Sequence, residues 1–330
     1  MKKWSFTLGV DVSKLTLDIH CWELNIHIKI VNGPEGFKVF QSWCKDFKID
    51  LKSTMIAMEF TGGYEHKFVQ FCFSKKIQYT RLPGLAIKNS LGIIRGKNDK
   101  VDAMRIAQYA KEKSADIKPA KPVNPIIIEL RQYLSFRKRL VRESAGYKAT
   151  LKERKVMYES QQNDILVKIM NNKIKENELT IKKLEQQIER LIQIDETLFM
   201  NYKILRSIKG IGNINALMTI GFTENFTSFK NARSYAVYVG VVPFDHSSGT
   251  SIRGRKRVSH LANKELKQEL NQAAKAAILW NNDLKVYAER KLKEKPYKVV
   301  LNNVKFKLIL RMFSLVSRGE FYVDKPQNAA

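Results

Sequence analysis

The stretch "TLGVDVSK", residues 7–14, decides how the first part of the chain is interpreted, because it places Asp11 inside an apolar, β-prone run. A carboxylate in such surroundings is costly to bury unless a cation or several hydrogen-bond donors lie beside it. For Asp11 alone, the simpler interpretation is a strand-end acid that faces solvent or caps a turn. The segments that would share a sheet with this strand decide between the two interpretations.

The first 113 residues alternate between strand and helix patterns. "WSFTLGVDVS", "LTLDIHCWEL" and "NIHIKIVN" have the period-2 alternation of three antiparallel strands. Helical spacing in "FKVFQSWCKDFK" is followed by a short apolar strand, "STMIAMEF", a helix over about 65–76, the strand "IQYTRL" and a helix over 99–113. The order βββαβαβα predicts a mixed sheet covered by helices.

Three more acids in this region stand where they can join Asp11. Glu59 ends the strand in "MIAMEF", and Asp99 and Asp102 in "KNDKVDAMRIA" are three residues apart, on one helix face. Asp99 could instead be only the N-cap of that helix. Two strand acids and two helix acids would suit a pair of hard divalent ions about 3.5–4 Å apart.

All of these ligands are oxygens, with no Cys or His among them, so they favour Mg²⁺ or Mn²⁺ over zinc. Three cationic side chains flank the helical acids and are candidates for holding phosphate oxygens on a nucleic acid: Arg95, Lys97 and Lys100.

The charge balance points to an anionic partner. Lys and Arg number 59 against 32 acids, which gives a net charge of +27. Nucleic acid is the leading candidate, because binding releases its condensed counterions, and a membrane surface or an acidic protein is the weaker one. No apolar run is long enough to span a membrane, and the N-terminus lacks the apolar core of a signal peptide. Three cysteines without CxxC spacing fit a reducing cytoplasm, with no disulfide frame and no zinc site.

A proline-punctuated stretch, "KPAKPVNP" at residues 118–125, marks a domain boundary, and a long charged region follows it. Apolar residues with 3-4 heptad spacing run through that region: Val167, Met170, Ile174, Ile181, Leu184, Ile188, Leu191 and Leu198. This spacing predicts a coiled-coil helical hairpin, with "YESQQND" at 158–164 as its turn. A surface helix pair and a dimerisation arm are equally consistent with it.

The remaining third of the chain is predicted to be mainly helical. "LRSIKGIGNINALMTIGF" indicates two helices joined by a G-x-G turn, which is either a helix-hairpin-helix DNA-binding element or a plain tight turn. "DHSSGTSIRGRKR", residues 245–257, on its own favours a basic loop that binds phosphate.

Taken together, the strand order and the four acids resemble the RNase H/RuvC fold. "GVDVSK", "MEFTGGY" and "KNDKVDAMRIAQYA" resemble the N-terminal DEDD domain of IS110-family transposases. "IKGIGNINALMTIG", "ARSYAVYVGVVPFDHSSGTSIRGRKR" and "NKELKQELNQAA" resemble the C-terminal transposase domain of the same family. The resemblance covers essentially the whole chain and implies three domains: a RuvC-like DEDD catalytic domain at 1–118, a coiled-coil region at 126–200 and a transposase domain at 201–330.

The resemblance implies a site-specific DNA recombinase that moves or inverts a mobile element. It implies that Ser248, directly before Gly249, attacks a DNA phosphate and forms a transient phosphoserine link, with Ser247 as the less favoured nucleophile. Mg²⁺ held by Asp11, Glu59, Asp99 and Asp102 would assist this step. Four cations after the serines would clamp the phosphate or merely tether nucleic acid: Arg253, Arg255, Lys256 and Arg257.

The expected partners are donor and target DNA, a structured guide RNA, and further copies of the chain in a dimer or tetramer, in the cytoplasm and away from membranes. One alternative is a RuvC-like, Mg²⁺-dependent, structure-specific endonuclease that uses water as its nucleophile. Another is a nucleic-acid-binding scaffold without catalysis.

Overall fold

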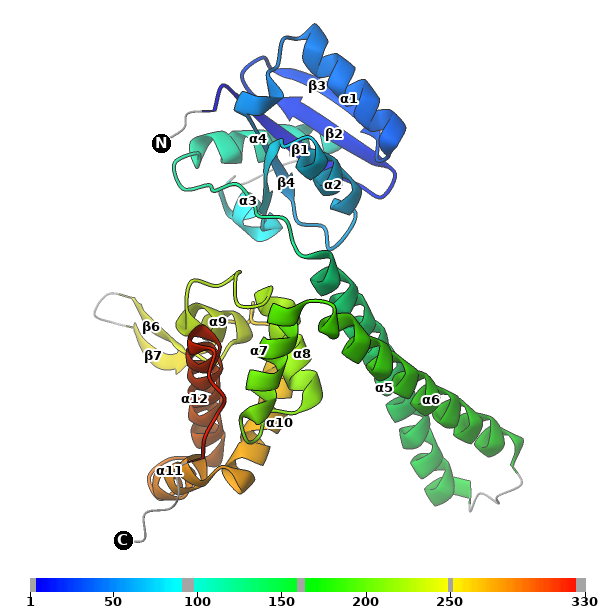
Figure 1. Cartoon of the computed structure of the whole chain (residues 1–330), viewed down its shortest axis with the longest axis vertical. Coiled ribbons are helices and arrows are strands. Elements are labelled where there is room, and N and C mark those ends of the chain that lie inside the picture. The colour runs from blue at the N-terminus through cyan, green and yellow to red at the C-terminus, as the bar shows by residue number, and fades with distance from the viewer. Residues whose placement is uncertain (1–3, 91–97, 159–163, 249–251, 325–330) are drawn as a thin grey trace. The chain divides into compact units, whose positions relative to one another are not determined.

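The computed structural model describes residues 4–90, 98–158, 164–248 and 252–324, with only the backbone of 245–248 and 252–257. These residues form two compact units, Met1–Pro122 and Val123–Ala330 (Figure 1). Each unit has a core of its own and is described by itself.

The first unit is built on a five-stranded sheet of order β3-β2-β1-β4-β5. β1 (Phe6–Val12), β2 (Thr16–Cys21) and β3 (Ile26–Val31) run antiparallel, which confirms the predicted meander. β4 (Thr54–Glu59) and β5 (Gln78–Leu82) are parallel to β1, so the sheet is mixed, as the element order predicted. The chain therefore brings β4 directly beside the strand that carries Asp11.

Helices cover both faces of this sheet (Figure 1). Because side chains alternate along a strand, Leu8 and Val10 point to one face and form a core with α1 (Pro34–Asp46) and α2 (His66–Ser74). α4 (Asp99–Glu112) packs on the other face, against β1 and β2. A 3₁₀ turn (Leu51–Ser53) precedes β4, and a short helix, α3 (Gly84–Ser90), follows β5. The core under α1 and α2 also buries three free thiols, those of Cys21, Cys44 and Cys72.

The second unit begins with two long helices that pack along one another, α5 (Pro125–Tyr158) and α6 (Ile165–Gln193). Ile174, Ile188 and Leu191 of the predicted seam are buried. Asn177, a polar residue that interrupts this seam, is buried with them and donates a 3.2 Å hydrogen bond to Ser144 Oγ on α5. The seam does not continue in one helix to Leu198, because α6 ends at Gln193. Asp195 then caps the next helix by accepting from Leu198 N at 3.1 Å. Of the predicted turn, residues 159–163 lie outside the described residues.

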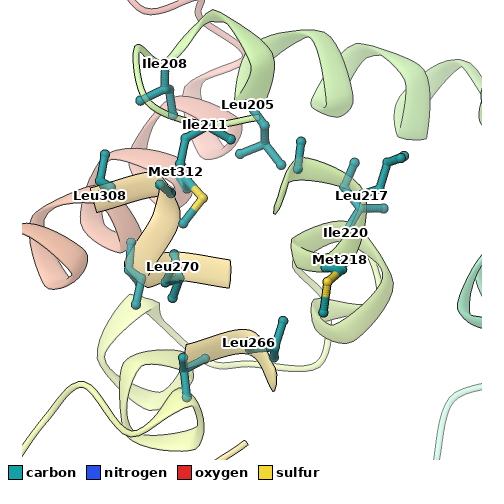
Figure 2. Packing of buried hydrophobic residues seen from close by; sticks show 14 of the residues in the cluster. Leu205, Ile208, Ile211, Leu217, Met218, Ile220, Leu266, Leu270, Leu308 and Met312 are labelled. Carbon is teal, nitrogen blue, oxygen red and sulfur yellow. The ribbon is translucent and has the colours of Figure 1, made fainter. Parts of the chain in front are cut away.

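The rest of the unit is a helical bundle of α7 (Glu196–Ser207), α8 (Asn213–Thr223), α9 (Ala232–Val239), α10 (Lys264–Trp280), α11 (Asn282–Leu292) and α12 (Tyr297–Arg318). Figure 2 shows Leu205, Leu217, Leu270 and Met312, from four different helices, meeting in its core. The first turns of α5 contribute to the same cluster through Ile127, Leu130 and Leu134. The base of the long helical pair is therefore part of the C-terminal core.

Two details of this unit bear on the sequence predictions. Gly210, in the G-x-G turn, has a φ of +100°, and a Cβ there would lie 2.6 Å from the Ala277 Cβ on α10. The turn thus requires glycine for its own packing. The basic stretch is a two-stranded antiparallel ribbon, β6 (Phe244–Ser248) and β7 (Ile252–Arg257), where the sequence favoured a loop. Among the helices of the described residues, none is both long and apolar enough to cross a membrane.

Candidate active site

Helix α4 lies directly on strand β1 at Gly9. A Cβ at this position would be 2.2 Å from the Ala103 carbonyl oxygen and 2.2 Å from the Ala107 amide nitrogen. Both atoms belong to the helix backbone, so no side-chain rotation can make room. The absence of a side chain at Gly9 therefore sets how closely the helix that carries Asp99 and Asp102 approaches the sheet.

Asp11 and Glu59 end neighbouring parallel strands. Val10 on β1 pairs with Met58 on β4. Asp11 directly follows Val10, and Glu59 directly follows Met58. Because Asp11 is two residues beyond Gly9, it lies on the sheet face that α4 covers. Both acids are half-buried. They therefore occupy the carboxyl ends of two central strands, beneath the helix.

The first turn of α4 supplies the other two predicted acids. Asn98 is the N-cap: its side-chain oxygen accepts from Lys100 N at 3.0 Å. The alternative interpretation of Asp99 as the cap is therefore wrong, and Asp99 is free for another role. The partial positive charge of a helix N-terminus favours acids in this turn. Asp102 also accepts a 2.9 Å hydrogen bond from Arg105 Nη1.

The charge environment shows that the four predicted acids lie together. The pKa of Asp11 is raised to about 6, first by burial and then by the negative charges of Asp99, Asp102, Glu59 and Asp18. Like charges nearby disfavour ionisation of a carboxyl group, so the site carries negative charge that it only partly neutralises.

Asp18 is a fifth acid, to which the sequence gave no role. It stands directly opposite Asp11 in the β1–β2 register and is buried. Its carboxylate lies 2.9 Å from His27 Nε2 and 3.2 Å from Lys29 Nζ, both on β3. Lys29 Nζ is also 3.7 Å from an Asp99 carboxylate oxygen. The period-2 pattern of "LDIHCW" indicates a strand in which residue 18 faces one side, but only the register places that residue opposite Asp11.

Glu59 has a close neighbour of a different kind. Its Oε1 lies 1.9 Å from the point that a Cβ on Gly84 would occupy. The bare backbone at Gly84, where α3 begins, leaves the space that this carboxylate fills. Glycines thus border the acidic cluster on two sides, under α4 and beside Glu59.

The cluster suits a hard cation by its chemistry. Within the described residues, no three Asp, Glu, His or Cys side chains come close enough together to hold a metal ion as they stand. The donors at the site are carboxylate oxygens, which Mg²⁺ and Mn²⁺ prefer. The pKa of Asp11 is raised first by burial and then by neighbouring negative charge, and a divalent cation would offset the second of these causes. The side chains therefore match such an ion in the chemistry of their donor atoms, but not in their present spacing.

The predicted phosphate-binding cations and the two serines are only partly described by the structure. Lys100 is exposed, at the second residue of α4, whereas Arg95 and Lys97 lie outside the described residues. Ser248 ends β6, where its backbone pairs with Ile252, and Ser247 pairs with Arg253. Of the two serines and four cations of this ribbon, the structure describes the backbone alone, and Gly249 is not described. The cations concerned are Arg253, Arg255, Lys256 and Arg257.

A mixed sheet of this order, with acids at the ends of its central strands and on the covering helix, is that of an RNase H-like α/β domain. Two family models match the chain. One for the DEDD domain of the IS110 type, described as "Transposase", matches residues 8–154, and "Transposase IS116/IS110/IS902 family" matches residues 202–289. The chain belongs to the IS110 family of transposases, and its activity is that of a DNA transposase.

Similar proteins carry compatible names. The chain is 26% identical over 273 residues to the pilin gene-inverting protein of Moraxella lacunata, a match that covers 80% of each chain. The protein of the same name from Moraxella bovis matches with the same identity and coverage. An uncharacterized 43.6 kDa protein of insertion element IS110 from Streptomyces coelicolor is 27% identical over 143 residues, 43% of this chain and 34% of that protein.

Proposed function

We propose that this transposase is a site-specific recombinase of a mobile element, which cuts and rejoins DNA through a transient phosphoserine link at Ser248. The observation that carries the proposal is that Asp11 and Glu59 end neighbouring strands beneath the helix that begins with Asp99 and Asp102, where burial and then the charges of the other three acids raise the pKa of Asp11. Isolated acids on a sheet would be solvated separately and would not shift one another's ionisation.

These four acids would hold Mg²⁺ or Mn²⁺, and the bound ion would stabilise negative charge that develops on a phosphate under attack. The protein's own contribution is orientation. Gly9 holds α4 against β1, Asn98 fixes the start of the helix, and Arg105 and Lys29 restrain Asp102 and Asp99. Asp18 forms ion pairs with His27 and Lys29 on β3. In this proposal, its negative charge adds to the field that attracts the cation to Asp11 from the neighbouring strand.

The serine step rests on the ribbon β6–β7. A serine hydroxyl is a weak nucleophile without activation, and the phosphate must be held while it attacks. β7 supplies a run of cations antiparallel to the strand that ends in Ser248, with Arg253 paired to Ser247. Arg253, Arg255, Lys256 and Arg257 are proposed to clamp the scissile phosphate or its neighbours.

The test is a trapping experiment on DNA that carries the element's junction. Wild type is expected to give a protein–DNA adduct that survives denaturation, Ser248→Ala to give none, and the matched variant Ser247→Ala to give nearly as much as wild type. An adduct of wild-type yield from Ser248→Ala would overturn the nucleophile assignment. Loss in Ser247→Ala alone would move the role to that serine.

A second candidate function follows from one observation: all four acids of the cluster belong to the first unit. A structure-specific endonuclease that uses water would require only this cluster. It predicts cleavage that depends on Asp11 and persists when both serines are replaced by alanine. A scaffold without catalysis predicts that Asp11→Ala changes nothing, while binding falls steeply with salt.

The partners belong to the same proposal. A recombinase must hold two duplexes, so we propose that it binds donor and target DNA, a structured guide RNA, and further copies of itself as a dimer or tetramer. The pair α5–α6 is proposed as a coiled-coil arm for that assembly. Its outer end exposes apolar side chains, among them Val156, Met157 and Ile165 at 78%, 70% and 67% exposure. We propose three domains with separate roles. Residues 1–118 hold the catalytic acids, residues 126–200 assemble copies of the chain, and residues 201–330 supply the serine that attacks the phosphate.

We also propose that the turn that joins α7 to α8 binds a DNA phosphate in the manner of a helix-hairpin-helix element. Gly212 precedes α8, and the backbone amides at a helix start can face an anion.

A further inference from the structure

A hollow of about 800 Å³ opens in the C-terminal unit, between α10, α12 and the segment 241–243 that follows α9. Among the residues whose side chains the structure describes, its lining includes five cationic side chains, from three helices, and no acidic one. These cations are Arg233, Lys267, Lys275, Lys298 and Lys305. None of the five forms an ion pair with a carboxylate of the described residues. The hollow is therefore a concentration of positive charge that no described carboxylate neutralises.

Helical spacing explains why the polar lining is continuous. Lys267, Asn271 and Lys275 follow one another at intervals of four along α10, so they share a face. Lys298, Asn302 and Lys305, at intervals of four and three, likewise share a face of α12, which packs against α10. Two rows of cations and amides thus border one space, although both helices bury apolar residues on their other faces.

Lys305 is the least expected member of this lining. It is 4% exposed, on a helix whose residues Val304 and Leu308 belong to the hydrophobic core. Burial, and then the charge of Lys267, lower its pKa to about 8. A buried ammonium with a like charge beside it and no carboxylate partner is costly. An anion in the hollow would supply the missing partner for both lysines.

The other lining residues narrow the class of anion. Tyr297 and Phe306 add aromatic surface, and Asn302 Nδ2 donates a 2.6 Å hydrogen bond to the Val241 carbonyl oxygen, which ties the segment before β6 to α12. Cations that follow a backbone, together with aromatic rings on which bases stack, are the combination that binds single-stranded nucleic acid. A hollow of this size matches small-ligand pockets and admits nucleotides of one strand, not a base-paired duplex.

We propose that this hollow binds the phosphates of a single nucleic-acid strand and so holds that strand beside β6, which begins directly after Pro243. The proposal rests on the chain's activity as a DNA transposase, but not on the assignment of Ser248. It adds a binding site outside both the acidic cluster and the ribbon. A strand held there would be fixed relative to the backbone that leads to the serines.

The experiment measures the affinity of the full chain for a fluorescent oligonucleotide of about 10 nucleotides, by anisotropy and across salt concentrations. The test variant combines Lys267→Gln, Lys275→Gln and Lys298→Gln. The matched control removes three exposed lysines of the same unit that lie outside the hollow: Lys182→Gln, Lys183→Gln and Lys285→Gln. We expect the test variant to bind about 10-fold more weakly and its salt slope to fall by about 2. The control should change affinity less than about 2-fold, because its lysines lie on open surface.

Lys305→Met separates a binding role from a structural one. Methionine keeps the length of the side chain and removes the buried charge, so the thermal midpoint should hold or rise while oligonucleotide affinity falls. Unchanged affinity in both Lys305→Met and the triple variant would overturn the proposal. So would a triple variant that loses polyglutamate binding but keeps oligonucleotide binding, because that result identifies an acidic protein as the occupant.

The failure of this proposal is distinguishable from failure of the serine assignment. Ser248→Ala should bind the oligonucleotide as wild type does, whatever its adduct yield. The hollow variants should still form adduct at saturating DNA.

Discussion

The contact between Gly9 and α4 gives the sharpest test of how the acidic cluster is built. In Gly9→Ala, the added methyl would meet two backbone atoms, Ala103 O and Ala107 N, each at 2.2 Å, where ordinary contact begins at 3.4 Å. The helix must therefore withdraw by about 1 Å, since neither atom can rotate away. Overpacking of this kind costs about 1–3 kcal/mol of the free energy of unfolding.

The same displacement carries Asp99 and Asp102 away from Asp11. A misplacement of about 1 Å at a catalytic constellation can cost about 100-fold in rate, so DNA cleavage should fall by that order. Stability is measured by urea denaturation with tryptophan fluorescence, which reports mainly on the first unit because Trp4, Trp22 and Trp43 belong to it. Cleavage is measured on junction DNA at a fixed Mg²⁺ concentration.

Gly146→Ala is the matched control. Gly146 lies within α5, and a Cβ there would meet nothing within 4 Å. Alanine should stabilise this helix by about 0.5–1 kcal/mol, because it loses less backbone entropy on folding than glycine does. If Gly9→Ala proves as stable and as active as wild type, then close approach at residue 9 does not position the acids, and the reasoning fails.

Two further predictions concern charge at the cluster. The Asp11 carboxyl ionises near 3.8 when unfolded and near 6 when folded, so the folded state holds its proton more tightly and loses stability as pH rises between those values. In the absence of divalent ions, Asp11→Asn should therefore be more stable than wild type at pH 7.5 by about 1–2 kcal/mol, after allowance for solvent screening, and nearly equal at pH 4. An equal difference at both pH values in urea denaturation would contradict this. Added Mg²⁺ should stabilise wild type by about 2.7 kcal/mol at 100 times its dissociation constant, and should leave the thermal midpoint of Asp11→Asn unchanged.

Much of the first unit follows from local pattern. Alternation in "LTLDIHCWEL" and "NIHIKIVN" predicted the meander correctly, because strands with one buried face must alternate. Asp11 and Glu59 were predicted because carboxylates on apolar strands need an explanation, and Asp99 and Asp102 because their spacing of three puts them on one helix face. Asp18 was missed because its partners His27 and Lys29 belong to another strand. Only the register of the sheet shows that these two side chains pair with its carboxylate.

Other features depend on tertiary packing that no local pattern reveals. Asn98, and not Asp99, became the cap because the chain enters α4 in extended conformation at residue 98. The heptad spacing runs on to Leu198, but the capping side chain of Asp195 ends the pattern by starting a new helix. The ribbon at 244–257 was read as a loop, since its charges mask the alternation that marks strands. No sequence pattern marked Lys305, which is buried on α12, a helix that packs against α10.

The burial of Cys21, Cys44 and Cys72 provides a reporter that needs no engineering. All three thiols lie in the core of the first unit, and the second unit contains no cysteine. Burial raises the pKa of each thiol, so alkylation must wait for this core to open. The rate of alkylation under native conditions therefore counts opening events of the sheet domain alone. Slower alkylation on addition of DNA or Mg²⁺ would show which of the two makes opening of that domain rarer. The helical unit contributes no alkylation signal, because it has no thiol.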